Sequence, residues 1–275
     1  QNTNLNVSPY FDDFVDSKNY HKVLFKPGFP VQARELTTLQ SILQNQVEKF
    51  GQHFFKEGSM VIPGGTTYDD EYFSVKIDPN FLNIPVSNYT KVLVDNAIKI
   101  KGETSGAEAL VINRITSSES IDGFDTLYVK YTKSGEDGVT STFLDGENLI
   151  TLSNINYLNT SIAADSQFAR CIVSDATSVG SAFSVSEGVY FIRGFFIKNV
   201  TSTIILDQYT NEPSYRVGFL LKEETIGPSS VNSDLYDNAK GFSNEAAPGA
   251  DRFKLSVTLH KKLLSDINDN DFVEL

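Results

Sequence analysis

The sequence predicts a mainly β protein with one long N-terminal α-helix and several small antiparallel β domains of barrel or sandwich type, in an elongated multidomain chain. Three observations support this fold class. Short apolar runs with strand-like composition recur from residue 57 onward, separated by Gly, Pro, Ser and Asp. One stretch, residues 31–56, has instead the period of an amphipathic helix. The 275 residues suffice for one large domain or about two to three small ones, each with its own core.

Residues 1–30 are predicted to form an extended N-terminal arm. The segment contains Pro9, Pro27 and Pro30 and shows no sustained hydrophobic period, which favours an extended conformation. It also carries aromatic side chains, too many for a solvated tail, namely Tyr10, Phe11, Phe14, Tyr20, Phe25 and Phe29. We therefore expect the arm to pack on another surface.

Residues 31–56 are predicted to form an assembly helix in which Gly51 is the only weak point. The apolar residues of the helix form one stripe: Leu36, Leu39, Leu43, Val47, Phe50 and Phe54. Their spacing fits a straight helix docked on its own β domain, and part of it fits a short coiled coil around a symmetry axis. Both arrangements remain open from the sequence. Burial at roughly 1.5–3 kcal/mol for each side chain makes the stripe too apolar to stay in water, so we expect it to be an interface.

The remainder is predicted to be β domains and loops. Residues 57–90 and 165–264 are assigned to one discontinuous β domain, and residues 91–164 to a small β-barrel or sandwich inserted into it. The polar stretch 227–251 is too long for an ordinary connection, which indicates a functional or interfacial loop. Residues 265–275 are expected to begin a further segment.

Composition and motifs argue against several classes of function. A net charge of −12 opposes binding to the phosphate backbone of nucleic acids, and the apolar run 189–197, interrupted by Arg193, is far shorter than the ~20 residues that cross a bilayer. We therefore expect neither nucleic acid nor a membrane as a partner. Cys171, the single cysteine, is predicted to be a small core residue.

No constellation in the sequence points to an enzyme, so we expect no catalytic residue, no cofactor and no metal. In "DINDND", Asp266, Asn268 and Asn270 fit the first three ligands of an EF-hand loop, but Asp271 stands where that loop requires Gly. A solvated acidic turn is the simpler interpretation. The three consecutive carboxylates of "YDDEY", at residues 68–72, would alternate between the faces of a strand and so would not converge.

The run "NVSPYFDDFVDSKNYHKVLFKPGFPVQARELTTLQSILQNQVEKFGQHFFKEGSMVIPGG", residues 6–65, resembles the N-terminal signature of virion structural proteins of tailed phages, especially marine myoviruses that infect cyanobacteria. Later blocks resemble the same family: "GVYFIRGFFI", "IILDQYTNEPSYRVGFLL" and "LYDNAKGFSNEAAPGADRFKL". "GETSGAEALV" and "FLDGENL" are similar to small β modules of phage tail and fibre proteins.

This resemblance implies a virion protein of the phage tail, in the baseplate or near the tail fibres. Its N-terminal part would anchor to the tail, further domains would follow Leu275, and its partners would be other tail proteins and, in a trimer, copies of itself. The alternative is a receptor-binding or carbohydrate-binding β protein of the tail tip, which exposed aromatic residues would support. A glycan-degrading tailspike fits less well, because the sequence shows neither a β-helix repeat nor paired carboxylates.

Overall fold

The computed structural model describes residues 3–228, 230, 235, 242 and 249–275, so most of the expected interfacial loop 227–251 lies outside the described residues. The protein is mainly β, and its principal strand pairings are antiparallel, which confirms the fold class at that level. Contacts divide the chain into two compact units. Unit 1 comprises Gln1–Thr66, Val185–Ser202 and Tyr215–Leu275, and unit 2 comprises Thr67–Ser184 and Thr203–Ser214.

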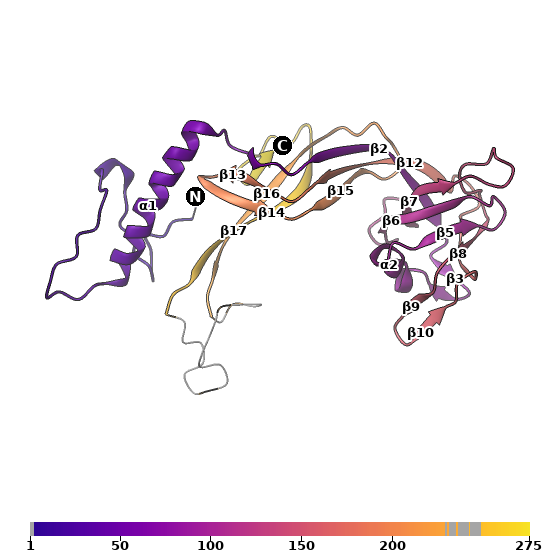
Figure 1. Ribbon diagram of the computed structural model, residues 1–275, viewed down its shortest axis with the longest axis horizontal. Coiled ribbons are helices and arrows are strands. Elements are labelled where there is room, and N and C mark those ends of the chain that lie inside the picture. The colour runs from indigo at the N-terminus through magenta and orange to yellow at the C-terminus, as the bar shows by residue number, and fades with distance from the viewer. Residues whose placement is uncertain (1–2, 229, 231–234, 236–241, 243–248) are drawn as a thin grey trace. The chain divides into compact units, whose positions relative to one another are not determined.

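Unit 1 combines the long helix with two three-stranded antiparallel sheets, ordered β1-β13-β14 and β17-β16-β18. The two sheets contact each other where Tyr190 of β13 packs edge-on against Phe219 of β16, both buried, with ring centroids 4.8 Å apart. The elements are η1 (Asp16–Lys18), α1 (Ala33–Phe54), β1 (Ser59–Ile62), β13 (Gly188–Ile192), β14 (Phe195–Asn199), β16 (Tyr215–Ile226), β17 (Arg252–Leu263) and β18 (Phe272–Glu274). Figure 1 labels α1, β13, β14, β16 and β17.

The local sequence explains where α1 begins and ends. At its start, the Glu35 carboxylate accepts a hydrogen bond from the backbone N–H of Gln32 at 2.8 Å, which satisfies a donor that the helix cannot pair internally. At its end, Gly58 has a φ of +79° and turns the chain into β1. The helix predicted over residues 31–56 is therefore present with ends that differ by two residues.

Gly51 brings α1 close to β13. A Cβ at this position would lie 2.4 Å from Cε2 of Phe191, and that ring is buried. The glycine that looked like a weak point in the helix is thus the point of closest contact with the sheet. On the same side of the helix, the Gln44 side chain donates a hydrogen bond to the Gly194 carbonyl at 2.9 Å.

Gly51→Ala is therefore expected to destabilise unit 1 by about 1–3 kcal/mol, because overpacking against a fixed ring outweighs the roughly 1 kcal/mol that alanine adds in helix propensity. The measurement is urea unfolding of the variant and the wild type. The control is Gln52→Ala at the exposed neighbouring position, with an expected change within about 0.5 kcal/mol. A Gly51→Ala protein more stable than the wild type would contradict the close contact.

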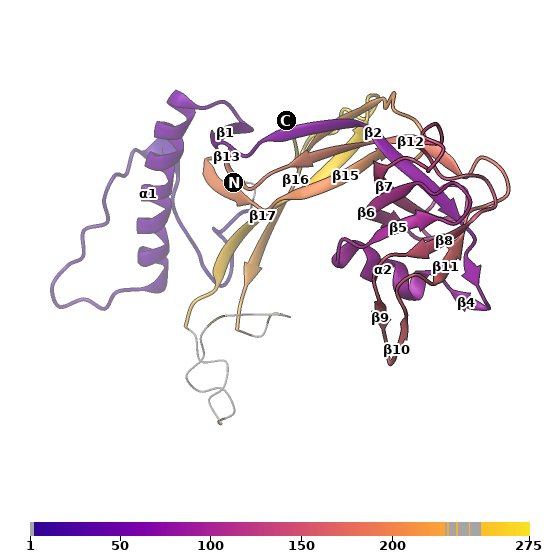
Figure 2. The same cartoon turned by 45° about the vertical axis from the view of Figure 1, so that its right-hand side comes forward.

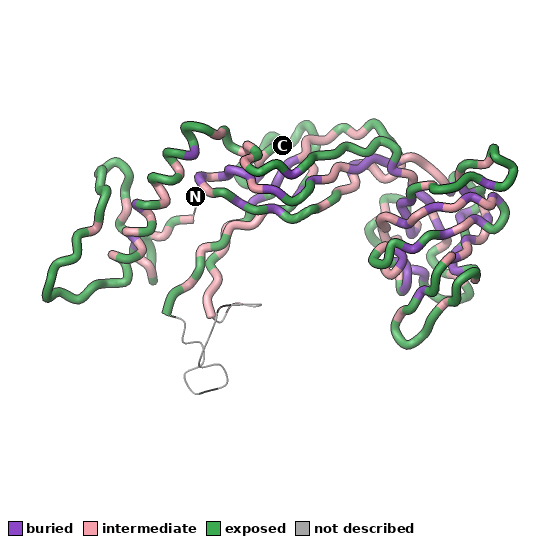
Figure 3. Tube along the Cα trace, viewed as in Figure 1, coloured by how far each residue is buried: buried purple, intermediate pink, exposed green. Residues whose placement is uncertain are grey.

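Unit 2 is built on an eight-stranded sheet ordered β11-β8-β5-β6-β7-β2-β12-β15. Figure 2 shows these strands from a second side, and Figure 3 shows the buried residues that run along them. The elements of the unit are β2 (Thr66–Ile77), β3 (Asn80–Phe81), β4 (Ile84–Pro85), α2 (Ser87–Asp95), β5 (Lys99–Gly102), β6 (Glu108–Ile115), β7 (Asp125–Lys133), β8 (Asn148–Thr151), β9 (Ile155–Tyr157), β10 (Thr160–Ile162), β11 (Gln167–Arg170), β12 (Thr177–Val185) and β15 (Ser202–Asp207).

The predicted boundaries of the inserted domain, residues 91–164, were too narrow. β2 was expected in the discontinuous domain, yet it pairs with β7 from Phe73↔Val129 to Ile77↔Asp125. β11 and β12 also join the sheet of unit 2. This boundary is decided by pairing between strands that are about fifty residues apart. Local sequence does not show such pairing.

Two further assignments were wrong. Residues 91–95 were assigned to the inserted β-barrel or sandwich, but they lie in α2, whose buried Tyr89, Thr90 and Leu93 pack on one side. Residues 265–275 were expected to begin a further segment, but β18 within them pairs with β16 and so belongs to unit 1. In both places tertiary packing outweighs the local preference of the sequence.

Candidate functional site

The two sides of α1 have opposite character. Thr38, Ile42 and Gly51 are its buried residues and face the rest of unit 1. The predicted apolar stripe, which we call the α1 face, consists of Leu36, Leu39, Leu43, Val47, Phe50 and Phe54. Leu39 is half-buried and the other members are exposed, with Leu43 at 59% and Phe50 at 65%. The apolar stripe is therefore not the surface by which the helix docks on its own chain.

Polar contacts to the arm fix the buried side of α1. Asp12 is buried, and its carboxylate accepts hydrogen bonds from the Thr38 hydroxyl at 3.0 Å and from the Ser41 hydroxyl. One turn short of the C-terminal end, the Lys49 ammonium lies 2.5 Å from the Asp16 carboxylate. These contacts set the rotation of the helix about its axis, so that the α1 face points away from unit 1.

Aromatic rings cluster at the C-terminal end of the α1 face. The Phe50 and Phe54 rings lie 4.9 Å apart between centroids, and the His53 ring meets Phe54 edge-on at 5.1 Å. Phe54 is 63% exposed. Because large aromatic side chains supply much of the energy of protein interfaces, this end of the helix is the strongest candidate for a contact centre.

The exposed area is large enough to matter energetically. Completing the burial of the five exposed members of the α1 face would contribute about 4–8 kcal/mol, from roughly 1.5–3 kcal/mol for each fully buried side chain scaled by its exposed fraction. Contiguous apolar surface on this scale marks a contact site in soluble proteins. The α1 face can therefore bind another apolar surface but has no groups with which to perform chemistry.

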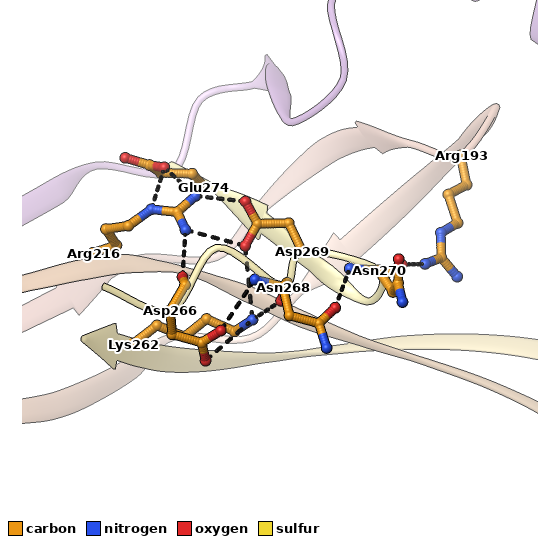
Figure 4. A network of polar contacts seen from close by, with 8 residues as sticks. All are labelled: Arg193, Arg216, Lys262, Asp266, Asn268, Asp269, Asn270 and Glu274. Carbon is orange, nitrogen blue, oxygen red and sulfur yellow. Dashed lines mark hydrogen bonds and ion pairs between the residues drawn. The ribbon is translucent and has the colours of Figure 1, made fainter. Parts of the chain in front are cut away.

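A charged cluster holds β18 onto β16 (Figure 4). The Arg216 guanidinium lies 2.6 Å from the Asp269 carboxylate and 2.7 Å from that of Glu274. The Lys262 ammonium lies 3.7 Å from Asp266 and 3.6 Å from Asp269. The hydrogen bond from Arg216 is the main reason that the pKa of Asp269 is lowered. The Arg193 guanidinium lies 2.8 Å from the Asp271 carboxylate. The acidic turn "DINDND" thus directs its three carboxylates at three cationic side chains and attaches β18.

A second polar cluster lies in unit 2 around Asp122. Its carboxylate lies 2.9 Å from the Lys76 ammonium and accepts hydrogen bonds from the Ser120 hydroxyl at 2.7 Å and the Tyr209 hydroxyl at 2.9 Å. Burial disfavours the charged carboxylate, but these hydrogen bonds outweigh it and lower the pKa of Asp122 to about 2. The cluster fastens the loop before β7 to the segment after β15.

Glu147 joins the two motifs that resemble a phage β module. It is buried, and its carboxylate accepts hydrogen bonds from the backbone N–H groups of Thr104 and Ser105, each at 2.9 Å, and of Leu144 at 2.7 Å. The Ser105 hydroxyl donates a further bond at 2.9 Å. A Cβ on Gly102 would lie 2.5 Å from the same carboxylate, so the glycine leaves it room. Local sequence does not show this pairing, because Thr104 and Ser105 lie some forty residues before Glu147.

Other residues weighed in the sequence have structural positions. Cys171 is buried, which confirms it as a core residue, and burial raises the pKa of its thiol to about 12. Tyr72, Tyr89, Tyr128 and Tyr190 are buried and therefore offer no platform for a sugar ring. Tyr68 is 47% exposed, and its hydroxyl donates to the Asn211 carbonyl at 2.8 Å.

Within the described ranges, no group of three or more His, Cys, Asp or Glu side chains is arranged to hold a metal ion. Neither α1 nor α2 is long and apolar enough to cross a lipid bilayer, and the part of the chain that the structure describes contains no other helix that could.

Comparison with known proteins adds one match. The model of a family described as a domain of unknown function (DUF4815) matches residues 8–119. The matched stretch begins in the arm, includes the whole of α1 and ends after β6, and it covers less than half of the chain. No curated protein and no solved structure matches the chain.

Proposed function

We propose that this protein is a structural subunit of a phage tail, assembled in the baseplate or tail-fibre attachment region through protein–protein contacts. The observation that carries the proposal is the α1 face, an apolar stripe exposed on a helix whose other side is fixed to unit 1. The resemblance of residues 6–65 to tail virion proteins supports it, and this run contains the arm and α1. The protein would act by holding neighbours together and would not act as an enzyme.

The α1 face favours self-association, with a trimer as the proposed state. Leu36, Leu43 and Phe50 repeat at the heptad distance, which is the spacing of residues that meet around a shared helical axis. All three are exposed on the same helix. Copies of the chain would then bury their α1 faces against one another, and the β-rich remainder of each copy would be free to contact other tail proteins.

The test of the tail assignment is the location of the protein in phage particles. Antibodies raised against the purified chain are expected to label the baseplate end of the tail in negative-stain immunoelectron microscopy of the phage that encodes it. Pre-absorption of the antibodies with the purified chain is the control and should remove the label. Particles labelled on the capsid alone, or carrying none of the protein by mass spectrometry, would contradict the proposal.

A further inference from the structure

The outer part of the arm, residues 17–32, which we call the arm loop, is exposed along almost its whole length (green in Figure 3). It is anchored at one end by the contact of Asp16 with Lys49 and at the other by the start of α1. Between these anchors every residue except Val23 is exposed, including Leu24 at 81% and Phe29 at 71%. A loop of this length, extended and rich in exposed apolar side chains, is typical of a binding segment.

The arm loop also differs from the rest of the chain in charge. It contains Lys18, Lys22 and Lys26 and no acidic residue, so its formal charge is +3. The whole chain has 23 Lys and Arg against 35 Asp and Glu, which leaves 20 against 35, a net charge of −15, outside the arm loop. A basic apolar segment on so acidic a chain is complementary to another copy of that chain.

A matching surface lies on the first half of β2. Its burial pattern shows Thr66–Glu71 exposed at every position, although the segment is a strand. β7 pairs with β2 only from Phe73 to Ile77, so on that side the first half of β2 extends beyond its neighbour. The exposed half carries Asp69, Asp70 and Glu71, the only three consecutive acidic residues in the sequence.

We propose that the arm loop of one copy docks along the exposed first half of β2 of a second copy. An extended segment laid beside an open strand edge can form main-chain hydrogen bonds, while its side chains read the neighbouring surface. Alternate residues of an extended chain share a side, so Lys22 and Lys26 lie on one side of the arm loop, and Asp69 and Glu71 lie on one side of β2. The contact rests on the self-association proposed above but uses a surface separate from the α1 face.

The test is a charge exchange measured by sedimentation equilibrium of the full chain. In the arm variant, Lys18, Lys22 and Lys26 are each replaced by Glu; in the acid variant, the three acidic residues of β2 are each replaced by Lys. Each variant is expected to weaken self-association by about tenfold or more, since attraction between a basic loop and an acidic strand is replaced by repulsion between like charges. Combining the two variants is expected to restore most of the wild-type affinity.

The control replaces three exposed lysines of unit 2 by Glu, namely Lys91, Lys99 and Lys130. This control changes the net charge by the same amount as the arm variant. It is expected to change the free energy of association by less than half as much as the arm variant does. An arm variant that associates as tightly as the wild type, or a combined variant with no recovery, would overturn the proposed contact.

Salt separates this contact from the one at the α1 face. Charged contacts at the surface weaken as the Debye length falls from about 8 Å at physiological ionic strength to about 3 Å at 1 M, whereas apolar burial does not. Raising the salt concentration is therefore expected to weaken association of the wild type but not that of the arm variant, in which like charges face each other. If the wild type associates and the arm variant has the same affinity and salt dependence, the arm contact alone is overturned. If the wild type is a monomer, both the arm contact and the contact at the α1 face are overturned.

Discussion

Replacing Leu43 and Phe50 of α1 by aspartate is expected to convert the self-associated protein into a monomer. Both side chains are mostly exposed in the single chain, so the substitutions remove little packing within unit 1 beyond the ring contact of Phe50 with Phe54. At a contact between copies, however, each aspartate would place a charge in an apolar environment, which costs several kcal/mol unless the charge is paired. This is the largest effect that we expect, and light scattering measures it as a loss of mass.

Gln52→Asp is the matched control. Gln52 is exposed on the same helix and lies about 160° around it from Leu36, at roughly 100° per residue. Gln52→Asp introduces the same side chain as the two test substitutions and is expected to leave the mass unchanged. If the variant with both substitutions kept the wild-type mass and thermal stability, the α1 face would not be a contact between copies.

Replacing Glu147 by alanine is expected to produce the largest loss of stability. Its carboxylate is buried and accepts bonds from three backbone N–H groups and one hydroxyl. Alanine would leave these donors without an acceptor, at about 1–3 kcal/mol for each that water cannot reach. We expect unit 2 to lose about 3 kcal/mol or more, which corresponds to a fall in Tm of roughly 10 °C.

Differential scanning calorimetry measures this effect, and Glu136→Ala is the control. Glu136 is an exposed carboxylate in the same unit, and its replacement is expected to change stability by no more than about 0.5 kcal/mol. Equal transition temperatures for the two variants would show that the bonds to Glu147 contribute little to holding the turns together.

The sequence predicted α1 well and the β units poorly, for a physical reason. The helix is specified by contacts within a few residues, through its period and through Glu35 at its start, so local sequence suffices. Strand partners are distant: the pairing of β2 with β7 placed a domain boundary where composition gave no signal. α2 was missed because its β-branched and aromatic residues favour strands locally, while burial of Tyr89 and Leu93 favours the helix.

The candidate site could be predicted in part. Periodicity found the stripe that became the α1 face, but it could not show that the stripe would lie away from unit 1. The contact of Asp12 with Thr38 and the close approach of Gly51 to Phe191 decide that orientation. Neither Asp12 nor Gly51 belongs to an apolar pattern. The charge of the arm loop was visible in the sequence, whereas its exposure required the structure.

The absolute mass of the wild-type chain, measured by light scattering across a concentration series, shows directly whether copies of the protein associate. Three copies of the 30.4 kDa chain would give about 91 kDa. We expect that mass at high concentration, with dissociation on dilution and after substitution of the α1 face. A mass of one chain at every concentration would contradict self-association and leave the exposed α1 face to other proteins.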